Sequence, residues 1–250
     1  MALHFFVDEP SVDGADVSTA DAGDEVVITG AEAHHAAVVR RVRIGEEVTV
    51  GDGRGVWLTG VVTASAPKRV VVSVTSRSHQ AAATPRIVLA QALAKGDRDE
   101  LAVQAATELG IDEVVPWQAA RSISRWTGEK AVKGVGRWQS IVREAAKQAH
   151  RAWTPTVGAV LTTRELAARA DRARVLVLEP TARTALTAVA LDDVAEVVLV
   201  VGPEGGVSAE EIAELTEAGA IAVRLGDTVL RTSTAGPAAL AIVNARLGRW

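Results

Sequence analysis

The segment of this chain best suited to chemistry spans residues 197–211. An apolar run leads there into Gly202-Pro203-Glu204-Gly205-Gly206 and then into a helix-forming stretch. Glycines let backbone N–H groups approach a ligand closely, and parallel α/β sheets bind ligands at the carboxyl ends of their strands. The loop is neither the G-x-G-x-x-G fingerprint nor a P-loop with its lysine. Taken alone, it is explained equally well as a tight turn.

A second loop of the same kind shifts the balance toward a ligand site. Leu225-Gly226 ends another apolar run and leads through residues 229–235 into a closing helix. Arg231 is the only cation in that segment, and the three hydroxyls of Thr232, Ser233 and Thr234 could cap the helix or contact a ligand. Two such loops in series are rarer than one, so we expect them to share a ligand.

A third group of polar residues follows one side of a predicted helix over residues 137–151. At 100° per residue, Arg137, Glu144, Gln148 and Arg151 fall in a stripe roughly 60° wide beside an apolar face that includes Trp138. Such a stripe suits a cleft or a subunit boundary. The competing explanation is a contact within the helix between Glu144 and Lys147 or Gln148.

The charge of the chain is unevenly distributed. Its net charge is -4, yet residues 121–151 carry eight basic side chains against two acidic ones, whereas residues 1–32 carry eight acidic and no Lys or Arg. A polyanion responds to a local patch within a Debye length of about 8 Å. A solvated helix face explains the basic segment equally well. Trp126 and Trp153 could stack on a base, although core packing is the commoner role of a tryptophan.

Absent features exclude several classes of function. The chain has no cysteine, which excludes disulfides, thiolate metal sites and cysteine nucleophiles. No clustered metal ligands are evident, and we interpret His34-His35 as structural, so no metal is expected. Its first ten residues lack a basic region, and no apolar run approaches the roughly 18 residues of a membrane span. We therefore expect a cytoplasmic protein with no membrane contact.

The elements that position these residues form two groups. Strand-like runs at 4–7, 25–29, 47–50, 56–62 and 70–75, with one helix at 31–41, predict a small β-barrel within residues 1–78. A linker is expected over residues 76–85. The remainder, residues 79–250, alternates helices with apolar runs at 87–90, 114–117, 175–178, 197–201 and 222–225, which predicts a mostly parallel α/β domain.

Helix boundaries in the second group have recognisable signals. Asp97 with Glu100 resembles a capping box, the helix that follows repeats Leu101, Ala105 and Leu109, and Gly110 would end it. Ser208 with Glu211 predicts a second capping box, for a helix ending at Gly219. Pro237 fits the first turn of the closing helix.

The two loops together carry a resemblance to a known family. G-P-E-G-G after a strand, followed by L-G-x-x-x-L-R-T-x-T-A, resembles the cofactor motifs of the RsmE family, SPOUT-class enzymes that methylate uridine N3 in 16S rRNA. The similarity extends to residues 4–7 (H-F-F-V), 91–98 (Q-A-L-A-K-G-D-R) and 106–111 (A-T-E-L-G-I), and to Arg137-Trp138, Glu144-Ala145 and Gln148. It implies a PUA-like RNA-binding barrel, a trefoil-knotted α/β domain, S-adenosylmethionine as cofactor and a homodimer acting on 16S rRNA or the assembled small subunit.

The resemblance also assigns roles to residues. It implies a cofactor site formed by Leu178, Glu179, Gly202, Pro203, Glu204, Gly205, Leu225, Gly226, Leu230, Arg231, Thr232 and Ala235. Arg231 is the first catalytic candidate, because a cation would stabilise the uracil anion left when N3 loses its proton. Bracing of the knot through backbone carbonyls explains this arginine almost equally well. Glu144 could accept that proton and Gln148 could hydrogen-bond the uracil edge. Many family members have glutamate where this chain has Ser233, so no role of that acid is carried over.

Phosphate contacts are expected from exposed cations in both parts of the chain: Arg40, Arg41, Arg43, Lys95, Arg98, Arg121, Arg125 and Arg151. Because the basic segment and the glycine loops are separate in sequence, we expect loss of Arg121 and Arg125 to weaken RNA binding alone. Gly205→Val is expected to fill the cofactor site.

Two other functions compete with uridine N3 methylation. A SPOUT ribose 2'-O-methyltransferase would share the fold and the cofactor, but Leu230-Arg231-Thr232 differs from the asparagine- and serine-rich final motif typical of that group. A non-catalytic RNA-binding module is disfavoured by the intact glycine loops. Methylation at uracil C5 generally requires a cysteine adduct, which this chain cannot form.

Overall fold

The computed structural model describes residues 2–7 and 13–250 and divides the chain into two compact units. The first unit contains residues up to 82 together with 146–154, and the second contains residues 83–145 and 155–250. Sequence reasoning assigned residues 146–154 to the second domain, whereas they pack with the first unit.

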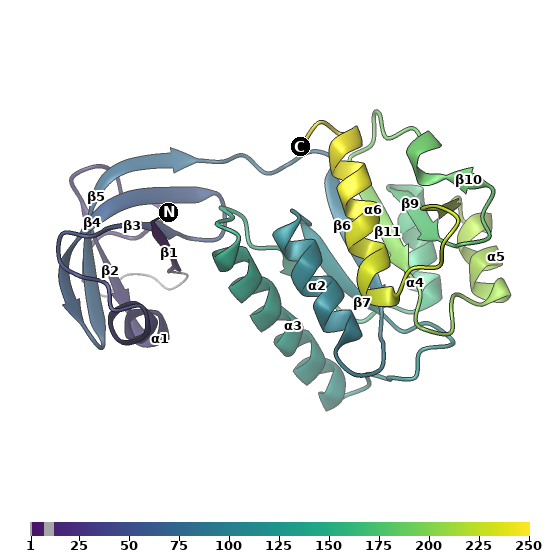
Figure 1. The fold of residues 1–250 in the computed structure, drawn as a ribbon, viewed down its shortest axis with the longest axis horizontal. Helices are drawn as coiled ribbons and strands as arrows, with labels where there is room; N and C mark the ends of the chain where they lie inside the picture. Colours follow the sequence, from purple (N-terminus) through teal and green to yellow (C-terminus); the bar gives the residue numbers. More distant parts are fainter. Residues whose placement is uncertain (1, 8–12) are drawn as a thin grey trace. The chain divides into compact units, whose positions relative to one another are not determined.

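The first unit is built on a curled five-stranded sheet (Figure 1). Its strands are β1 (Leu3–Phe6), β2 (Glu25–Thr29), β3 (Glu47–Gly51), β4 (Val56–Ala66) and β5 (Arg69–His79), in the order β1-β3-β4-β5-β2. β1 pairs parallel with β3 and the other pairs are antiparallel. Side chains of β4 alternate between buried and half-buried, as period-two packing on one core requires.

Two elements of this unit differ from their prediction. The helix expected over 31–41 is a short α1 (Gly30–His34) followed by one π-helical turn, His35–Val39. β5 continues through His79, where a linker was expected from Ser76. Its polar end remains a strand because its backbone pairs with Val56 to Thr59 of β4 and because Arg77 donates hydrogen bonds to the carbonyls of Ser18 and Ala20.

The second unit contains a seven-stranded, fully parallel sheet in the order β10-β12-β9-β11-β6-β7-β8. Its strands are β6 (Arg86–Ala92), β7 (Glu113–Trp117), β8 (Thr156–Val157), β9 (Arg174–Leu178), β10 (Thr184–Ala185), β11 (Glu196–Val201) and β12 (Ile221–Arg224). The very short β8 and β10 had no sequence signal, because two residues are too few to show a period.

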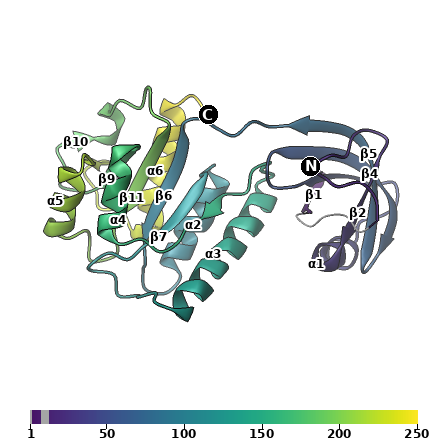
Figure 2. The same cartoon turned by 180° about the vertical axis from the view of Figure 1, so that it is seen from behind.

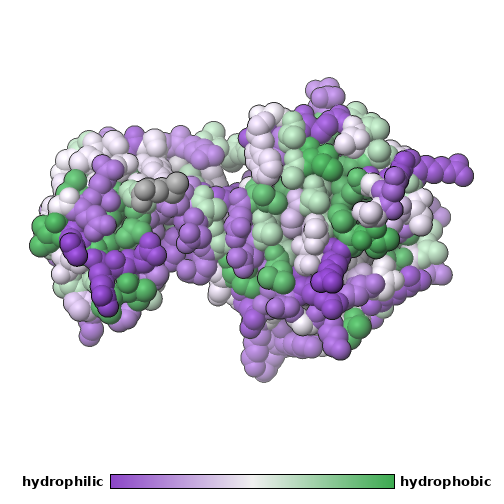
Figure 3. All heavy atoms as spheres, in the orientation of Figure 1, coloured by the Kyte–Doolittle hydropathy of each residue, from purple (hydrophilic) through white to green (hydrophobic). Residues whose placement is uncertain are grey.

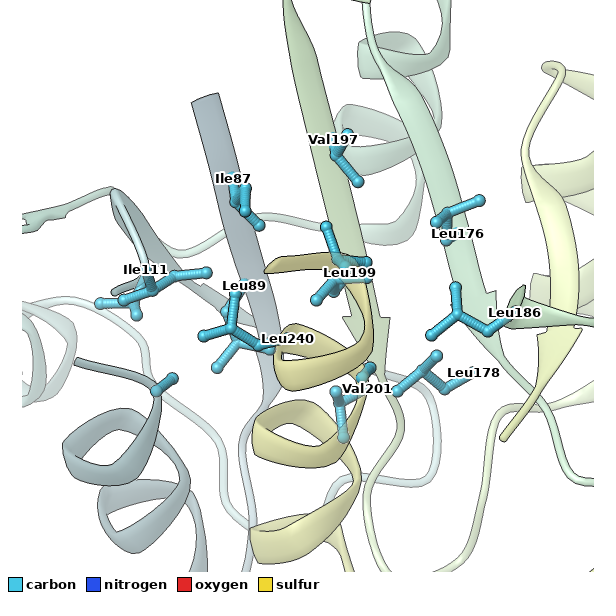
Figure 4. Packing of buried hydrophobic residues seen from close by; sticks show 14 of the residues in the cluster. Ile87, Leu89, Ile111, Leu176, Leu178, Leu186, Val197, Leu199, Val201 and Leu240 are labelled. Atoms are coloured by element: carbon cyan, nitrogen blue, oxygen red, sulfur yellow. The ribbon is translucent and has the colours of Figure 1, made fainter. Parts of the chain in front are cut away.

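Helices cover both faces of this sheet (Figures 1 and 2). They are α2 (Arg98–Glu108), α3 (Glu129–Gln148), α4 (Thr163–Ala167), α5 (Ala209–Glu217) and α6 (Thr232–Arg246). Ile87, Leu89 and Leu199 pack on the face that carries Leu240 of α6 (Figure 4). Residues of opposite parity, such as Val88 and Val198, pack with α4 and α5. Burial on both faces explains why these strands are continuously apolar.

Two helices begin elsewhere than predicted. α3 begins at Glu129, about two turns before Arg137, and ends at Gln148, so Arg151 lies outside it. α6 begins at Thr232, which places Pro237 in the second turn and not the first. Proline lacks an N–H, so the helix loses the hydrogen bond to the carbonyl of Ser233 four residues earlier.

α2 buries a different face from the expected one. Its buried side chains include Asp99, Ala102, Val103 and Ala106, while Leu101 is 50% exposed. Asp97 forms no side-chain cap; instead the carboxylate of Asp99 accepts hydrogen bonds from the N–H groups of Ala94 and Glu100. Burial raises the pKa of Asp99 above its ordinary value.

The capping box of α5 is confirmed. The Ser208 hydroxyl accepts from the Glu211 N–H at 3.2 Å, and the Glu211 carboxylate accepts from the Ser208 N–H at 3.1 Å. A second box, unforeseen, opens α4 with Thr162 and Glu165. Among the described residues, no helix is both long and apolar enough to cross a membrane.

Candidate functional site

A cavity of about 450 Å³ lies at the carboxyl ends of β9, β11 and β12. Its walls are the residues after β9, the G-P-E-G-G loop after β11, the loop from Leu225 to Leu230 and the first turn of α6. Every residue expected at the cofactor lines this pocket except Gly205. The volume lies within the range of roughly 300–1,000 Å³ that small-molecule sites occupy. The lining also includes residues that sequence reasoning did not single out: Pro180, Val201, Gly206, Val207, Val223, Thr228 and Val229.

Two glycines of the G-P-E-G-G loop allow its backbone to turn tightly. A Cβ on Gly202 would lie 2.8 Å from Cγ2 of Val207, so no larger residue fits there without a shift. Gly206 has a φ of +72°, a conformation that favours glycine, and its N–H donates to the carbonyl of Pro203 at 2.9 Å. The loop is therefore a compact turn whose backbone borders the pocket.

A buried hydroxyl joins three segments at the base of the pocket. Thr232 donates its hydroxyl hydrogen to the carbonyl of Gly202 at 2.8 Å and accepts from Nε2 of Gln91 at 2.9 Å. Gln91 is completely buried at the end of β6. Thr232 thus connects the starts of the β6 and β11 loops to α6. It does not cap the helix, because the cap position is Arg231, whose side chain makes no capping bond.

Glu204 occupies the rim of the pocket with two donors on one oxygen. Its Oε1 accepts from Nη1 of Arg98 at 2.9 Å and from the N–H of Lys95 at 3.1 Å. Burial raises the pKa of the Glu204 carboxyl, but hydrogen bonds from backbone N–H groups and from Arg98 outweigh burial, so the pKa lies below its ordinary value. Arg98, which is expected to contact RNA, also lines the pocket.

Arg231 is exposed at the same pocket. Among the described residues, none forms a hydrogen bond or ion pair with its guanidinium, so the alternative role of bracing backbone carbonyls is not seen. A cation without an internal partner at the edge of a cavity can face charge that develops on a ligand.

The stripe on α3 does not reach this pocket. Glu144 and Gln148 are both exposed, neither lines the cavity, and Gln148 belongs to the other compact unit. Arg137 pairs with Glu100 of α2 and so connects two helices. Helical periodicity correctly placed the stripe beside the buried Trp138. Periodicity alone does not predict which other part of the protein or which ligand the stripe contacts.

The remaining candidate RNA ligands fall in both units. Arg40, Arg41 and Arg43 are exposed in the first unit, and Arg41 has a φ of +55°, which is rare for a residue with a side chain. Arg121 donates from Nη1 to the carbonyl of Gly205 at 2.9 Å, and Arg125 donates from Nη2 to the carbonyl of Ala120 at the same distance.

The two tryptophans considered for base stacking pack against protein. The ring of Trp126 meets Trp138 edge-on at 5.3 Å and lies over Gly134, and Trp153 donates its indole N–H to the carbonyl of Gln80. The described residues contain no group of three or more His, Cys, Asp or Glu side chains that could hold a metal ion.

Comparison with known proteins now decides the family. A model of the RNA methyltransferase domain matches residues 82–244, and a model of the RNA methyltransferase PUA domain matches residues 28–75. Ribosomal RNA small subunit methyltransferase E of Mycobacterium bovis is 42% identical over 100% of this chain and 94% of its own length. The protein of that name in Bacillus subtilis is 31% identical over 87% of this chain and 88% of its own.

This chain belongs to the ribosomal RNA small subunit methyltransferase E family.

Solved structures of similar proteins share its fold. That of Ribosomal RNA small subunit methyltransferase E from Neisseria gonorrhoeae, bound to S-adenosyl methionine, is 28% identical, with a TM-score of 0.86 over 98% of both chains. A methyltransferase from Legionella pneumophila in complex with the same cofactor is 25% identical, with a TM-score of 0.82 over 98% of both chains. The expected fold class is thereby confirmed: a SPOUT-type parallel-sheet domain with a small PUA-like β domain.

Proposed function

We propose that this chain transfers a methyl group from S-adenosylmethionine to N3 of a uridine in small-subunit ribosomal RNA. One observation carries the proposal: the two family motifs, separated in sequence, meet in one cavity beside a cation that has no partner among the described residues. The relatives of that name, one of them solved with S-adenosyl methionine, and the cofactor-bound methyltransferase from Legionella pneumophila support this ligand for the cavity.

The pocket lining suits this cofactor. Leu178, Leu225 and Leu230 offer apolar surface for an adenine ring and for the methylene groups of the methionine chain. Glu179 and Glu204 offer carboxylates to ribose hydroxyls and to an ammonium group, which are the polar handles of the molecule. The backbone groups of the G-P-E-G-G loop border the same space.

When bound, the cofactor supplies an electrophilic methyl group on a positively charged sulfur. The protein has to hold the uracil in line, remove the proton from N3 and stabilise the resulting anion on the flanking oxygens. We assign the last task to Arg231, which is exposed at the pocket. Glu144 and Gln148 stay candidates for the proton and the uracil edge; they would approach from outside this chain's own pocket, which a homodimer allows.

The substrate is proposed to be 16S rRNA or the assembled small subunit, met in the cytoplasm where ribosomes are made. Phosphate contacts would come from Arg40, Arg41, Arg43 and Arg151 on the first unit and from Lys95, Arg98, Arg121 and Arg125 on the second. Ribose 2'-O methylation is the second candidate, since it would use the same cofactor pocket.

Calorimetric titration with S-adenosylmethionine tests the pocket assignment. We expect affinity in the micromolar range without added metal, and we expect Ala235→Phe to abolish it because residue 235 lines the cavity. Gly136→Ala is a matched control, because a Cβ there meets nothing within 4 Å and the position lies outside the pocket. Wild-type affinity in Ala235→Phe would place the cofactor elsewhere.

A further inference from the structure

Gly205 is a family-motif glycine that faces an arginine and not the pocket. A Cβ at this position would lie 3.2 Å from Cβ and 3.5 Å from Cδ of Arg121. The Arg121 side chain therefore lies along the outer side of the G-P-E-G-G loop, where its Nη1 donates to the carbonyl of Gly205 at 2.9 Å. The expectation that Gly205→Val fills the cofactor site is wrong on this geometry, because the added side chain would meet Arg121.

The segment that carries Arg121 is also anchored to α5, the helix that follows the G-P-E-G-G loop. Glu211, at 6% exposure, accepts from the N–H of Ala120 at 2.7 Å through Oε1 and from the N–H of Ser208 at 3.1 Å through Oε2. Arg125 closes the segment on itself through the carbonyl of Ala120. The backbone next to Arg121 is thus fixed relative to the helix that follows the glycine loop.

Arg121 retains donors for a second ligand. A guanidinium has five N–H groups in a fixed fork, and the contact with Gly205 uses one nitrogen. The residue is exposed, so an RNA phosphate can reach the remaining donors while the carbonyl contact stays in place. One side chain can therefore hold the cofactor loop and an RNA phosphate together.

We propose that Arg121 is a positioning residue for the cofactor loop and that RNA and cofactor binding are linked through it. The inference rests on the proposed function. Arg121 preorganises the loop, which lowers the ordering cost of cofactor binding. A phosphate on the same guanidinium immobilises it further, so RNA binding tightens cofactor binding, and linkage requires the reverse effect to be equal. Arg121 is then an outer support of the cofactor loop as well as a phosphate ligand.

The test measures cofactor affinity calorimetrically with and without an unmodified small-subunit rRNA fragment. Without RNA, Arg121→Met should weaken S-adenosylmethionine binding about fivefold, as expected for one lost hydrogen bond, and Arg121→Lys should restore it to within about twofold. Lys130→Met is the matched control: it also removes an exposed basic side chain of the same segment, at a position given no role in cofactor or phosphate binding. RNA should tighten cofactor binding about fivefold in wild type and Lys130→Met, and not in Arg121→Met.

Hydrogen exchange of the Gly206 amide supplies a readout that needs neither ligand. This N–H closes the glycine loop onto Pro203, so it should exchange faster in Arg121→Met than in Lys130→Met at equal thermal stability. Wild-type cofactor affinity, RNA linkage and Gly206 exchange in Arg121→Met would overturn the inference. A wild-type protein that binds no S-adenosylmethionine would instead contradict the proposed function itself, and the inference with it.

Discussion

Arg231 is the residue on which the proposed chemistry depends most. It is exposed at the pocket, and its guanidinium has no partner among the described residues. Replacing Arg231 with alanine should lower the single-turnover rate of methyl transfer by roughly 100-fold, the effect of losing one charge-stabilising donor. Affinity for the cofactor and for RNA should change little. A normal rate in this variant would make the arginine structural and direct attention to Gln148 and Arg151.

The hydroxyl of Thr232 is expected to stabilise the base of the pocket. Thr232→Val keeps the shape of the side chain but removes the hydrogen bonds to Gly202 and Gln91, leaving a buried acceptor and a buried donor unpaired. We expect about tenfold weaker cofactor binding and a loss of about 2 kcal/mol in unfolding free energy. Thr232→Ser keeps the hydroxyl and should recover most of both. Equal losses in the two variants would mean that the methyl group, and not the hydroxyl, matters.

Glu204 gives a prediction about pH. Its folded-state pKa lies below the ordinary value of 4.5, so its stabilising contribution is present above that value and disappears as the pH falls through the folded-state pKa. Arg98→Met should raise the pKa of Glu204, because one of the donors that favour its ionised form is lost. Carboxyl-carbon NMR titration measures this directly, with Arg125→Met as the control. An unchanged pKa would show that Arg98 does not hold Glu204 in solution.

For individual residues, the sequence predicted which ones line the pocket better than it predicted their contacts. Leu178, Gly202 and Leu225 end strands or follow them, and parallel strands bring those ends to one edge of the sheet. The contact between Arg121 and Gly205, and the bond between Gln91 and Thr232, join residues far apart in the chain. No local sequence pattern predicts such pairs. The prediction that Arg121 contacts RNA therefore missed its hydrogen bond to the Gly205 carbonyl.

Among the elements, the start of α5 is the one whose disruption should destabilise the most neighbouring segments. Glu211 caps this helix and also accepts from Ala120 N–H and from the Thr163 hydroxyl. Glu211→Ala should lower the unfolding free energy by about 3 kcal/mol, because several buried donors lose their acceptor. Glu165→Ala removes the matching residue of the exposed box on α4 and should cost at most about 1 kcal/mol. Chemical denaturation that gives equal losses would contradict the central role of Glu211.

Elements with strong local signals were predicted well, and those decided by packing were not. β2 occupies the predicted residues, and the Ser208 box forms as written. α2 buries its small residues and Asp99, and leaves Leu101 exposed. It packs closely against neighbours that include α6, and such close packing favours small side chains at the contact. The earlier start of α3 was not predicted because residues 129–136 include two glycines, Gly134 and Gly136, which disfavour a helix.

For the whole molecule, a homodimer remains a prediction from family resemblance. The surface over and beside α6 carries apolar side chains (Figure 3), with Ile242 only partly buried and Val229 79% exposed. An apolar patch on a single chain often marks a protein interface. Sedimentation should give about twice 26.1 kDa, and Val229→Asp should shift the equilibrium toward the monomer. A wild-type monomer that methylates RNA at micromolar concentration would exclude the dimer as a requirement.

Identification of the methylated atom tests the central claim most directly. Small subunits from a strain lacking this protein would be incubated with it and with methyl-labelled S-adenosylmethionine, and their 16S rRNA digested for nucleoside mass spectrometry. We predict labelled N3-methyluridine, absent without the protein and reduced roughly 100-fold in initial rate with Arg231→Ala. Label on a ribose 2'-oxygen, on another base, or nowhere in the RNA would contradict it.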